Sequence, residues 1–179
     1  MNLSSWRKCQ KCGLHVFRRK VVLGRGKTPA DILFIGEAPG KSEDLRGFAF
    51  IGPAGQLLDD GMDKAAEIAK LDLPTFYITN VVACRPTDKK HGPNREPTGE
   101  EAWACWVRLS ETYDLVNPKA VVFLGKVAEQ YCKAAWPGAF SLQHPAYILR
   151  QGGARSTEFK RFSRDLGEIF KLVHSQKEG

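Results

Sequence analysis

The chain has 179 residues, of which 42% are hydrophobic, and 27 Lys and Arg outnumber 20 Asp and Glu to give a net charge of +7. This length suffices for one globular core, and no run approaches the roughly 18 apolar residues of a membrane-spanning helix. Residues 1–6 lack the apolar core of a secretory signal, so we expect a cytoplasmic protein, whose basic surplus fits either a polyanionic partner or a merely solvated surface.

The first motif in the chain is a C-x2-C knuckle made by Cys9 and Cys12. Cys84 and Cys105 lie far from it in sequence, and Cys132 falls in a helical pattern that predicts a buried core position. In a cytosolic chain, cysteines of this kind favour a metal centre over disulfides. Four thiolates suit zinc or an iron–sulfur cluster, and spacing leans toward zinc without deciding between them.

A glycine-rich segment, residues 24–28, is similar to a nucleotide-binding P-loop. Val21 stands where the first glycine of that motif belongs, and the segment precedes a strand instead of following one. We therefore expect an ordinary turn at this place.

The following segment combines an apolar run with two glycine-rich loops. Residues 32–35 have the length and composition of a strand, and the loop at 36–40 holds two glycines and a proline that let the backbone pass close to a ligand. A second glycine-rich turn, residues 47–55, leads into a helical pattern over residues 57–65. A strand that opens onto a backbone-lined concave site is typical of ligand binding in α/β proteins.

Strands and helices continue to alternate along the chain. Residues 76–82, 119–124 and 140–142 are predicted strands, and Thr98 with Glu101 forms the capping box of a helix between the first two. This alternation predicts an α/β fold in which helices flank a parallel sheet of four strands within one domain.

Polar residues or glycine stand near the carboxyl end of each predicted strand. Glu37, Asn80, Gly125 and His144 all occupy such positions, and the carboxyl ends of parallel strands meet at one edge of the sheet. Each residue alone has an ordinary explanation: a turn cap for Asn80, a satisfied core histidine for His144, a solvated side chain for Glu37. Their joint placement favours a site.

In this order, the motifs resemble those of the family 4 uracil-DNA glycosylases, the iron–sulfur type. The segments that carry the resemblance are residues 36–44, 47–58, 78–86, 94–98, 124–125 and 144–150. The resemblance implies a three-layer α/β/α fold in a single domain over residues 1–179. It also implies a structural [4Fe–4S] cluster that ties the knuckle to the loop before the Thr98 helix, with zinc as the alternative. Its ligands would be Cys9, Cys12, Cys84 and Cys105.

The implied activity is DNA repair, in which the enzyme flips uracil out of single- or double-stranded DNA and hydrolyses its N-glycosidic bond. The resemblance gives Phe50 the role of stacking platform and Asn80 that of pairing with N3–H and O4 of uracil. His144 would stabilise the departing base at O2. The turn that contains Gly36, Ala38 and Gly40 would position base and water. Phe48 is expected to pack in the core.

Water activation is the open part of this interpretation. Ala38 stands where the best-known branch of the superfamily has an aspartate, so Glu37 and Glu43 are the nearest carboxylates. Gly40 stands where that branch has an aromatic residue that excludes the thymine methyl group. A glycosylase for another damaged base, or a non-catalytic nucleic-acid-binding protein with a metal site of four cysteines, therefore remains as an alternative.

Contacts to DNA are expected on both sides of the pocket. Backbone amides near Gly52 and Gly55 would hold phosphates, and Pro145, Tyr147 and Arg150 belong to the opposite turn. One residue among 147–150 would fill the space that the flipped base leaves. His91 is expected to be a solvated loop residue, and the protein is expected to be a monomer.

Overall fold

The computed structural model describes residues 3–178 and is built around a five-stranded sheet in the order β1-β3-β2-β4-β5. β2, β3, β4 and β5 are mutually parallel, as predicted, and β1 runs antiparallel to β3 at the edge. The strands are β1 Arg25–Gly26, β2 Ile32–Gly36, β3 Phe76–Asn80, β4 Ala120–Leu124 and β5 Phe140–Leu142.

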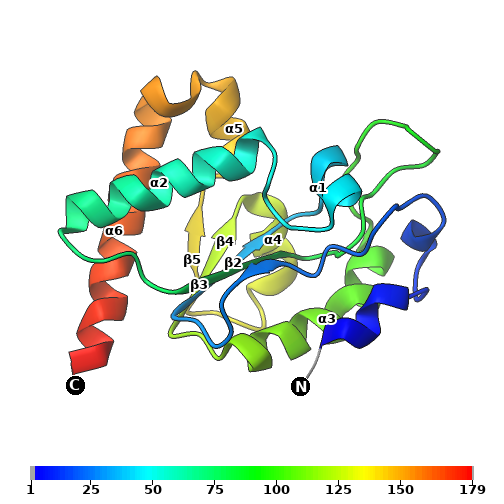
Figure 1. The fold of residues 1–179 in the computed structure, drawn as a ribbon, viewed down its shortest axis with the longest axis horizontal. Helices are drawn as coiled ribbons and strands as arrows, with labels where there is room; N and C mark the ends of the chain where they lie inside the picture. Colours follow the sequence, from blue (N-terminus) through cyan, green and yellow to red (C-terminus); the bar gives the residue numbers. More distant parts are fainter. Residues whose placement is uncertain (1–2, 179) are drawn as a thin grey trace.

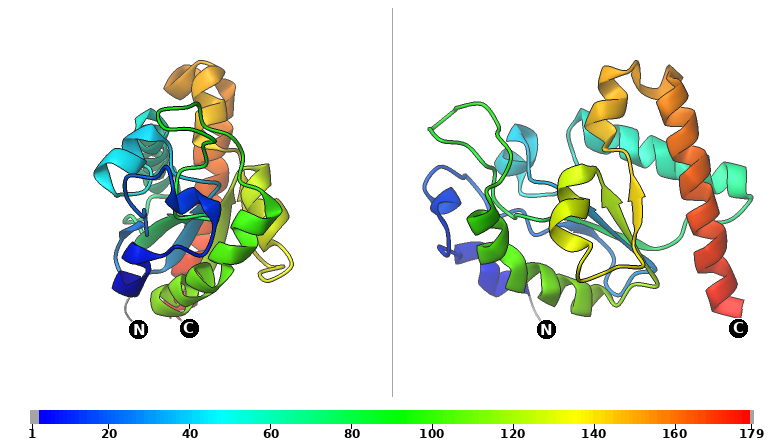
Figure 2. Two further views of the ribbon diagram at one scale, coloured as in Figure 1. Left: turned by 90° about the vertical axis from the view of Figure 1, so that its right-hand side faces the viewer. Right: turned by 180° about the vertical axis from the view of Figure 1, so that it is seen from behind.

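Helices cover both faces of the sheet, which gives the three-layer α/β/α arrangement (Figure 1). One layer contains α2, α5 and α6, and the other contains α3, α4 and the amino-terminal 3-10 helices (Figure 2). The helices are α1 Lys41–Arg46, α2 Pro53–Ala69, α3 Gly99–Val116, α4 Lys126–Cys132, α5 Pro145–Arg150 and α6 Thr157–Glu178, and the 3-10 helices are η1 Leu3–Lys8, η2 Gly13–His15 and η3 Gly153–Arg155.

Two hydrophobic cores form because strand side chains alternate between the faces of the sheet. In β2, Leu33 and Ile35 face the α3 layer, whereas Ile32 and Phe34 face α2 and α6. All four are at most 1% exposed, so the central strand is buried on both sides, as parallel strands usually are. Cys132 is also fully buried, as predicted, and burial raises the pKa of its thiol to about 12.

The expectation of an ordinary turn at residues 24–28 was incomplete, because Arg25 and Gly26 pair with Ile78 and Tyr77 as a fifth strand. Glycine is needed for this close approach: a Cβ on Gly26 would clash with the Phe76 carbonyl oxygen, and its φ is +127°. A strand of two residues has no periodicity that sequence could reveal.

The helix boundaries follow local signals in the sequence. Thr98 caps α3, and its Oγ1 accepts the Glu101 N–H while the Glu101 carboxylate accepts the Thr98 N–H, which confirms the capping box. Residues 145–150 form α5 instead of a turn, since Pro145 occupies its first helical position. No helix within residues 3–178 is long and apolar enough to cross a membrane.

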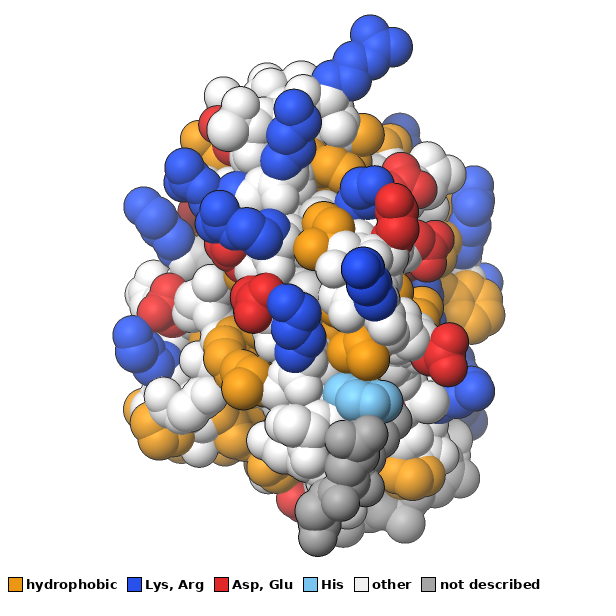
Figure 3. Space-filling view, turned by 90° about the vertical axis from the view of Figure 1, so that its left-hand side faces the viewer, with side chains coloured by type: hydrophobic (Ala, Val, Ile, Leu, Met, Phe, Trp, Pro, Cys, Tyr) orange, Lys and Arg blue, Asp and Glu red, His pale blue; other side chains and the backbone are white. Residues whose placement is uncertain are grey.

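The face formed by α2 and α6 carries side chains of both charges. On the face formed by α2 and α6, Lys and Arg stand among Asp and Glu, with hydrophobic side chains between them (Figure 3). Such a mixed surface does not single out one anion-binding site on that face.

Candidate active site and cysteine centre

Of the four residues predicted to gather at the carboxyl ends of the strands, Glu37, Asn80 and His144 line one pocket. Gly36 and Gly125 lie directly behind it and leave room for its side chains. A Cβ on Gly36 would come within 2.7 Å of Asn80 Oδ1, and one on Gly125 within 2.9 Å of the His144 Cβ. The pocket is lined by Glu37, Ala38, Gly40, Glu43, Phe50, Ala54, Asn80, Asn94, His144, Ala146, Tyr147 and Arg150.

Asn80 ends β3 and is only 1% exposed. Its backbone carbonyl accepts a hydrogen bond from Arg108 Nη2 at 2.6 Å, which fixes the main chain. Its side-chain Oδ1 is buried at the pocket and has no hydrogen-bond partner among the described residues. Because an unpaired buried amide oxygen is costly, this atom is suited to accept an N–H group from a ligand.

Phe50 lies at the pocket with its ring centroid 5.7 Å from that of His144. Its backbone adopts φ +51°, and the first turn of α2 approaches so closely that a Cβ on Gly55 would clash with the Phe50 carbonyl oxygen. Arg25 donates to the carbonyls of Ala49 and Phe50 and forms an ion pair with Asp59. The ring is thus held by a loop that is fixed from two sides.

Phe48 does not pack in the core, contrary to expectation, but is 57% exposed. Gly47 ends α1 with φ +89°, and the chain then turns so that Phe48 points outward while Phe50 is buried. The choice between two phenylalanines two residues apart depends on this turn, which no sequence period describes.

His144 is the N-cap residue of α5, and its Nδ1 accepts the Ala146 N–H at 3.1 Å. Burial, with a smaller effect of the Arg150 charge, lowers the pKa of His144 to about 4. The ring is therefore neutral at neutral pH, and since Nδ1 is an acceptor, the proton resides on Nε2. His144 offers a neutral N–H donor to the pocket.

The two carboxylates of the pocket have different surroundings. Burial raises the pKa of Glu37, and the charge of Glu96 raises it further. Glu43 Oε1 accepts the N–H groups of Ile51 at 3.0 Å and Gly52 at 2.8 Å, so this carboxylate holds the loop that precedes α2. Glu37 is the carboxylate left to act on a bound molecule, while the Gly52 amide is already engaged by Glu43.

The remaining predicted DNA-contacting residues lie at the rim or behind it. Tyr147 and Arg150 are exposed and line the pocket. Pro145 is buried at the start of α5, and Ile148 is fully buried in the core. Ile148 is therefore excluded as the residue that enters a vacated base stack.

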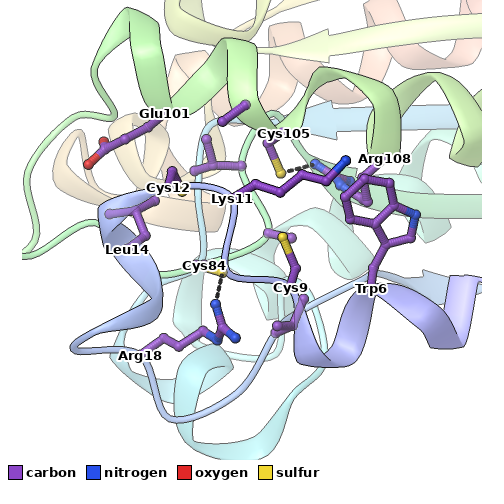
Figure 4. Close-up of a pocket in the computed structure, with 14 residues that line it drawn as sticks. Trp6, Cys9, Lys11, Cys12, Leu14, Arg18, Cys84, Glu101, Cys105 and Arg108 are labelled. Carbon is purple, nitrogen blue, oxygen red and sulfur yellow. Dashed lines mark hydrogen bonds between the residues drawn. The ribbon is translucent and has the colours of Figure 1, made fainter.

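The four cysteines at positions 9, 12, 84 and 105 line a second cavity, between the amino-terminal segment and α3 (Figure 4). Trp6, Leu14, Val21, Val82 and Ala83 supply apolar walls to it. In residues 3–178, no three His, Cys, Asp or Glu side chains converge closely enough to hold a single metal ion, so the sulfurs border the cavity without meeting at one point.

Two guanidinium groups direct N–H groups at these sulfurs. Arg18 Nη1 lies 3.5 Å from Cys84 Sγ, and Arg108 Nη2 lies 3.5 Å from Cys105 Sγ (Figure 4). Burial raises the pKa of the free Cys84 thiol to about 12, and the charge of Arg18 opposes this. Thiolate ligands with nearby cationic donors in an apolar cavity are the surroundings that an iron–sulfur cluster uses, so the residues fit such a group.

Arg108 links this cavity to the pocket. It is fully buried and donates to Thr79 Oγ1 at 2.9 Å and to the carbonyls of Asn80 and Val81 at 2.6 and 2.7 Å, besides Cys105 Sγ. Sequence reasoning missed this residue, because Arg108 lies in the middle of a helix and its oxygen acceptors are almost thirty residues earlier in the chain. The one available signal was a charged residue within an apolar helix face.

We predict that Arg108→Met destabilises the fold by about 2–4 kcal/mol, because three oxygen acceptors and Cys105 Sγ lose their donor while only the desolvation of one cation is relieved. Urea unfolding measures this, with Arg164→Met on the exposed face of α6 as the control, which should change stability by no more than about 0.5 kcal/mol. Equal effects of the two substitutions would contradict the role assigned to Arg108.

Comparison with known proteins agrees with this geometry. A family profile described as the uracil DNA glycosylase superfamily matches residues 23–167. The chain is 42% identical over 123 residues to a type-4 uracil-DNA glycosylase of Sulfurisphaera tokodaii and 39% identical over 125 residues to one of Saccharolobus solfataricus. These alignments cover 69% and 70% of this chain, but they span only 52% and 54% of those proteins, about half their length.

A type-4 uracil-DNA glycosylase of Thermotoga maritima is 36% identical in an alignment of 172 positions, and the match covers 87% of this chain and 83% of that protein. The similarity therefore extends over most of both chains, and the profile match over residues 23–167 includes every residue that lines the pocket. On this basis the chain belongs to the uracil DNA glycosylase superfamily, within its type-4 family.

Proposed function

We propose that the protein excises uracil from DNA, single- or double-stranded, and leaves an abasic site. The observation that carries the proposal is the unpaired, buried Oδ1 of Asn80, a residue that lines a pocket with an aromatic ring and a neutral N–H donor. An imide base offers the matching set: an N3–H donor for Oδ1, an O4 acceptor for the Asn80 amide group, and O2 for His144 Nε2. Phe50 supplies the stacking surface.

His144 would stabilise the charge that develops when the bond between C1′ of the sugar and N1 of the base breaks. The bonding electron pair stays with uracil, whose anion carries negative charge on O2. A neutral Nε2–H group at this position can donate a hydrogen bond to the oxygen in the protonation state that the ring has at neutral pH. Hydrogen bonds to charged groups contribute roughly 1.5–3 kcal/mol. The backbone of the Glu37–Gly40 turn would orient the water that adds to C1′.

Glu37 would accept the proton of that water, so we predict that Glu37→Gln lowers kcat by about 100-fold. Burial raises the pKa of Glu37 above its ordinary value of 4.5, so the wild-type kcat should fall as pH drops through this raised value. The acidic limb should be absent from the pH profile of Glu37→Gln. In Glu96→Gln it should move to lower pH, because one repelling charge is gone. An unchanged kcat in Glu37→Gln would reject Glu37 as the base.

We further propose that Cys9, Cys12, Cys84 and Cys105 hold a [4Fe–4S] cluster that clips the amino-terminal knuckle to the segments around β3 and α3 within one domain. When bound, the group would supply cross-linking of the fold, since thiolate ligation couples to folding. The apolar cavity and the donors Arg18 and Arg108 support this assignment over a bare surface knuckle.

A cysteine exchange tests this assignment. Cys9→Ala is predicted to lose bound iron, the broad visible absorption of the cluster and thermal stability, whereas Cys132→Ala, outside the cavity, should keep all three. Metal analysis of anaerobically purified protein separates the outcomes. Stoichiometric zinc without iron would favour zinc as the bound metal and would overturn the assignment of a cluster.

On the DNA side, Tyr147 and Arg150 at the exposed rim are our candidates for filling the space left by the flipped base. Action on DNA would place the protein in the cytoplasm, and a monomer holds every residue that the proposed reaction uses.

The decisive experiment is cleavage of a single-uracil oligonucleotide followed by alkali. Strand breaks at uracil support the proposal, whereas intact DNA in the presence of folded, metal-loaded protein would refute it.

A second candidate function rests on Gly40, which lines the pocket without a side chain that could exclude a 5-substituted or otherwise altered base. Oligonucleotides with hypoxanthine, xanthine or thymine opposite guanine, assayed beside uracil, measure how strict the pocket is. Faster release of one of these bases than of uracil would make that lesion the principal substrate.

A further inference from the structure

A second hollow with a basic lining lies beside the pocket. We call it the basic groove; its lining residues are Val16, Phe17, Arg18, Arg19, Asp44, Arg85, Lys90 and His91. Apart from Asp44 of α1, these residues come from two segments far apart in sequence, the loop after the cysteine knuckle and the loop that follows β3, which lie side by side in Figures 1 and 2. The uracil pocket uses Asn94 from the second of these loops, but it shares no lining residue with the basic groove.

The charges of the groove are not neutralised within it. Asp44 is the one carboxylate of the lining, and it is buried and already accepts the backbone N–H groups of Arg19 at 2.8 Å and Lys20 at 3.4 Å. The exposed side chains of Arg19 and Lys90 make no hydrogen bond or ion pair with any residue in the described range 3–178. Two cations are therefore available to an anionic ligand.

The groove and the pocket share a wall. α1 separates them, because Glu43 faces the pocket and its neighbour Asp44 lines the groove. Arg85, in the groove, donates from Nε to Asn94 Oδ1, and Asn94 lines the pocket. The groove therefore lies next to the pocket, on the other side of α1.

Apolar surface accompanies the free cations. Val16 is 60% exposed and Phe17 is 39% exposed, both on the groove. Cationic side chains beside an accessible aromatic ring are the combination that binds single-stranded nucleic acid, because phosphates pair with the cations and an unpaired base stacks on the ring. Base pairs inside a duplex do not offer such a face.

We propose that the basic groove binds the single-stranded DNA segment that flanks the target uracil, with Arg19 and Lys90 on phosphates and Phe17 against a base. This inference rests on the proposed uracil excision, which it extends from the target base to its neighbours in the same strand. It makes an unpaired flank the preferred surrounding of the substrate.

The test compares the double variant Arg19→Ala/Lys90→Ala with Arg164→Ala/Lys171→Ala, which removes the same charges from exposed positions on α6. The probe is a uracil-free single-stranded oligonucleotide, whose dissociation constant is measured by fluorescence anisotropy at several salt concentrations. Loss of two phosphate contacts should lower the slope of log affinity against log salt by about 1.4 in the groove variant. The control should keep the wild-type slope.

Phe17→Ala separates stacking from charge. It should weaken binding of the same probe by about 5- to 150-fold while the salt slope stays unchanged. Unfolding temperature and visible absorption of each variant verify that the fold and the cysteine centre are intact. Wild-type affinity and slope in both groove variants would overturn the proposal.

The position of the groove is tested with substrates that carry a long flank on only the 5′ or only the 3′ side of uracil. One of the two should be excised faster than a short oligonucleotide by the wild type, and the groove variants should lose that advantage. Excision by the wild type without any flank effect would refute the groove and leave the proposed function standing. Absence of excision with altered probe binding would refute the function and leave the groove.

Discussion

Replacing Asn80 with alanine is expected to lower kcat/KM for uracil excision by at least about 100-fold. The substitution removes the acceptor for N3–H and the donor to O4, and a buried polar group left without a partner costs about 1–3 kcal/mol. Each 1.4 kcal/mol corresponds to a factor of 10 in kcat/KM. Two losses of about this size at one base therefore lower kcat/KM by about 100-fold. The unpaired, buried Oδ1 of Asn80 is the structural basis of this expectation.

Single-turnover cleavage of a uracil oligonucleotide measures the effect, with Gln130→Ala, an exposed amide on α4, as the matched control. Gln130→Ala should retain wild-type rates. Retention of the Arg108 hydrogen bond to the Asn80 carbonyl should keep the variant folded, which the unfolding temperature verifies. A folded Asn80→Ala protein with wild-type kcat/KM would show that the base is read by other groups.

Replacing His144 with alanine is expected to reduce kcat by about 100- to 1,000-fold with little change in KM, because its donor acts on charge that develops only as the base departs. His174→Ala, an exposed histidine on α6, is the control. Since the pKa of His144 is about 4, the ring stays neutral, and the wild-type kcat should show no step from this residue between pH 6 and 8. A step near pH 6.5 that disappears in His144→Ala would contradict the assigned neutral state.

The same lowered pKa makes a prediction about stability. Above pH 6.5 the ring is neutral in the folded and unfolded chains, so this residue does not change the free energy of unfolding with pH there. As pH falls from 6.5 toward 4, the unfolded chain binds a proton that the folded chain resists, so stability falls by about 1.4 kcal/mol per pH unit. Urea unfolding at several pH values should show this loss in the wild type and not in His144→Ala.

The local signals of the sequence were sufficient for most of the secondary structure. The apolar runs before Glu37 and Asn80 predicted strands because parallel strands are buried on both faces. The capping box of Thr98 and Glu101 fixed where α3 begins, since both partners lie within one turn of helix. Polar residues that directly follow such strands could be assigned to one sheet edge without coordinates.

Chemistry that depends on residue type was also contained in the sequence. Four cysteines placed away from any disulfide pattern predicted a shared centre, and the structure places all four around one cavity. The resemblance to family 4 then supplied what spacing did not, a preference for iron–sulfur over zinc. Glu37, Asn80 and His144 line the pocket as the strand-end rule required.

Only the tertiary structure decided which atoms of these residues are free. In sequence, Glu43 is as good a candidate for the site carboxylate as Glu37. In the structure it accepts two backbone N–H groups, whereas the Oδ1 of Asn80 has no partner in the described chain. Phe48 and Phe50 are the same type of residue, but Phe48 is exposed and Phe50 is buried because of the turn that begins at Gly47. Such differences depend on the direction of a side chain, which periodicity does not encode.

Contacts between distant segments were likewise invisible in the sequence. Arg108 binds acceptors in and after β3, the strand β1 needs β3 for its hydrogen bonds, and the basic groove joins loops around residues 18 and 90. Sequence patterns record neighbours within a few residues, where helix and strand periods act. The partner of a buried guanidinium or a free surface cation is set by packing of the whole chain, and that is why these sites emerged only once the fold was known.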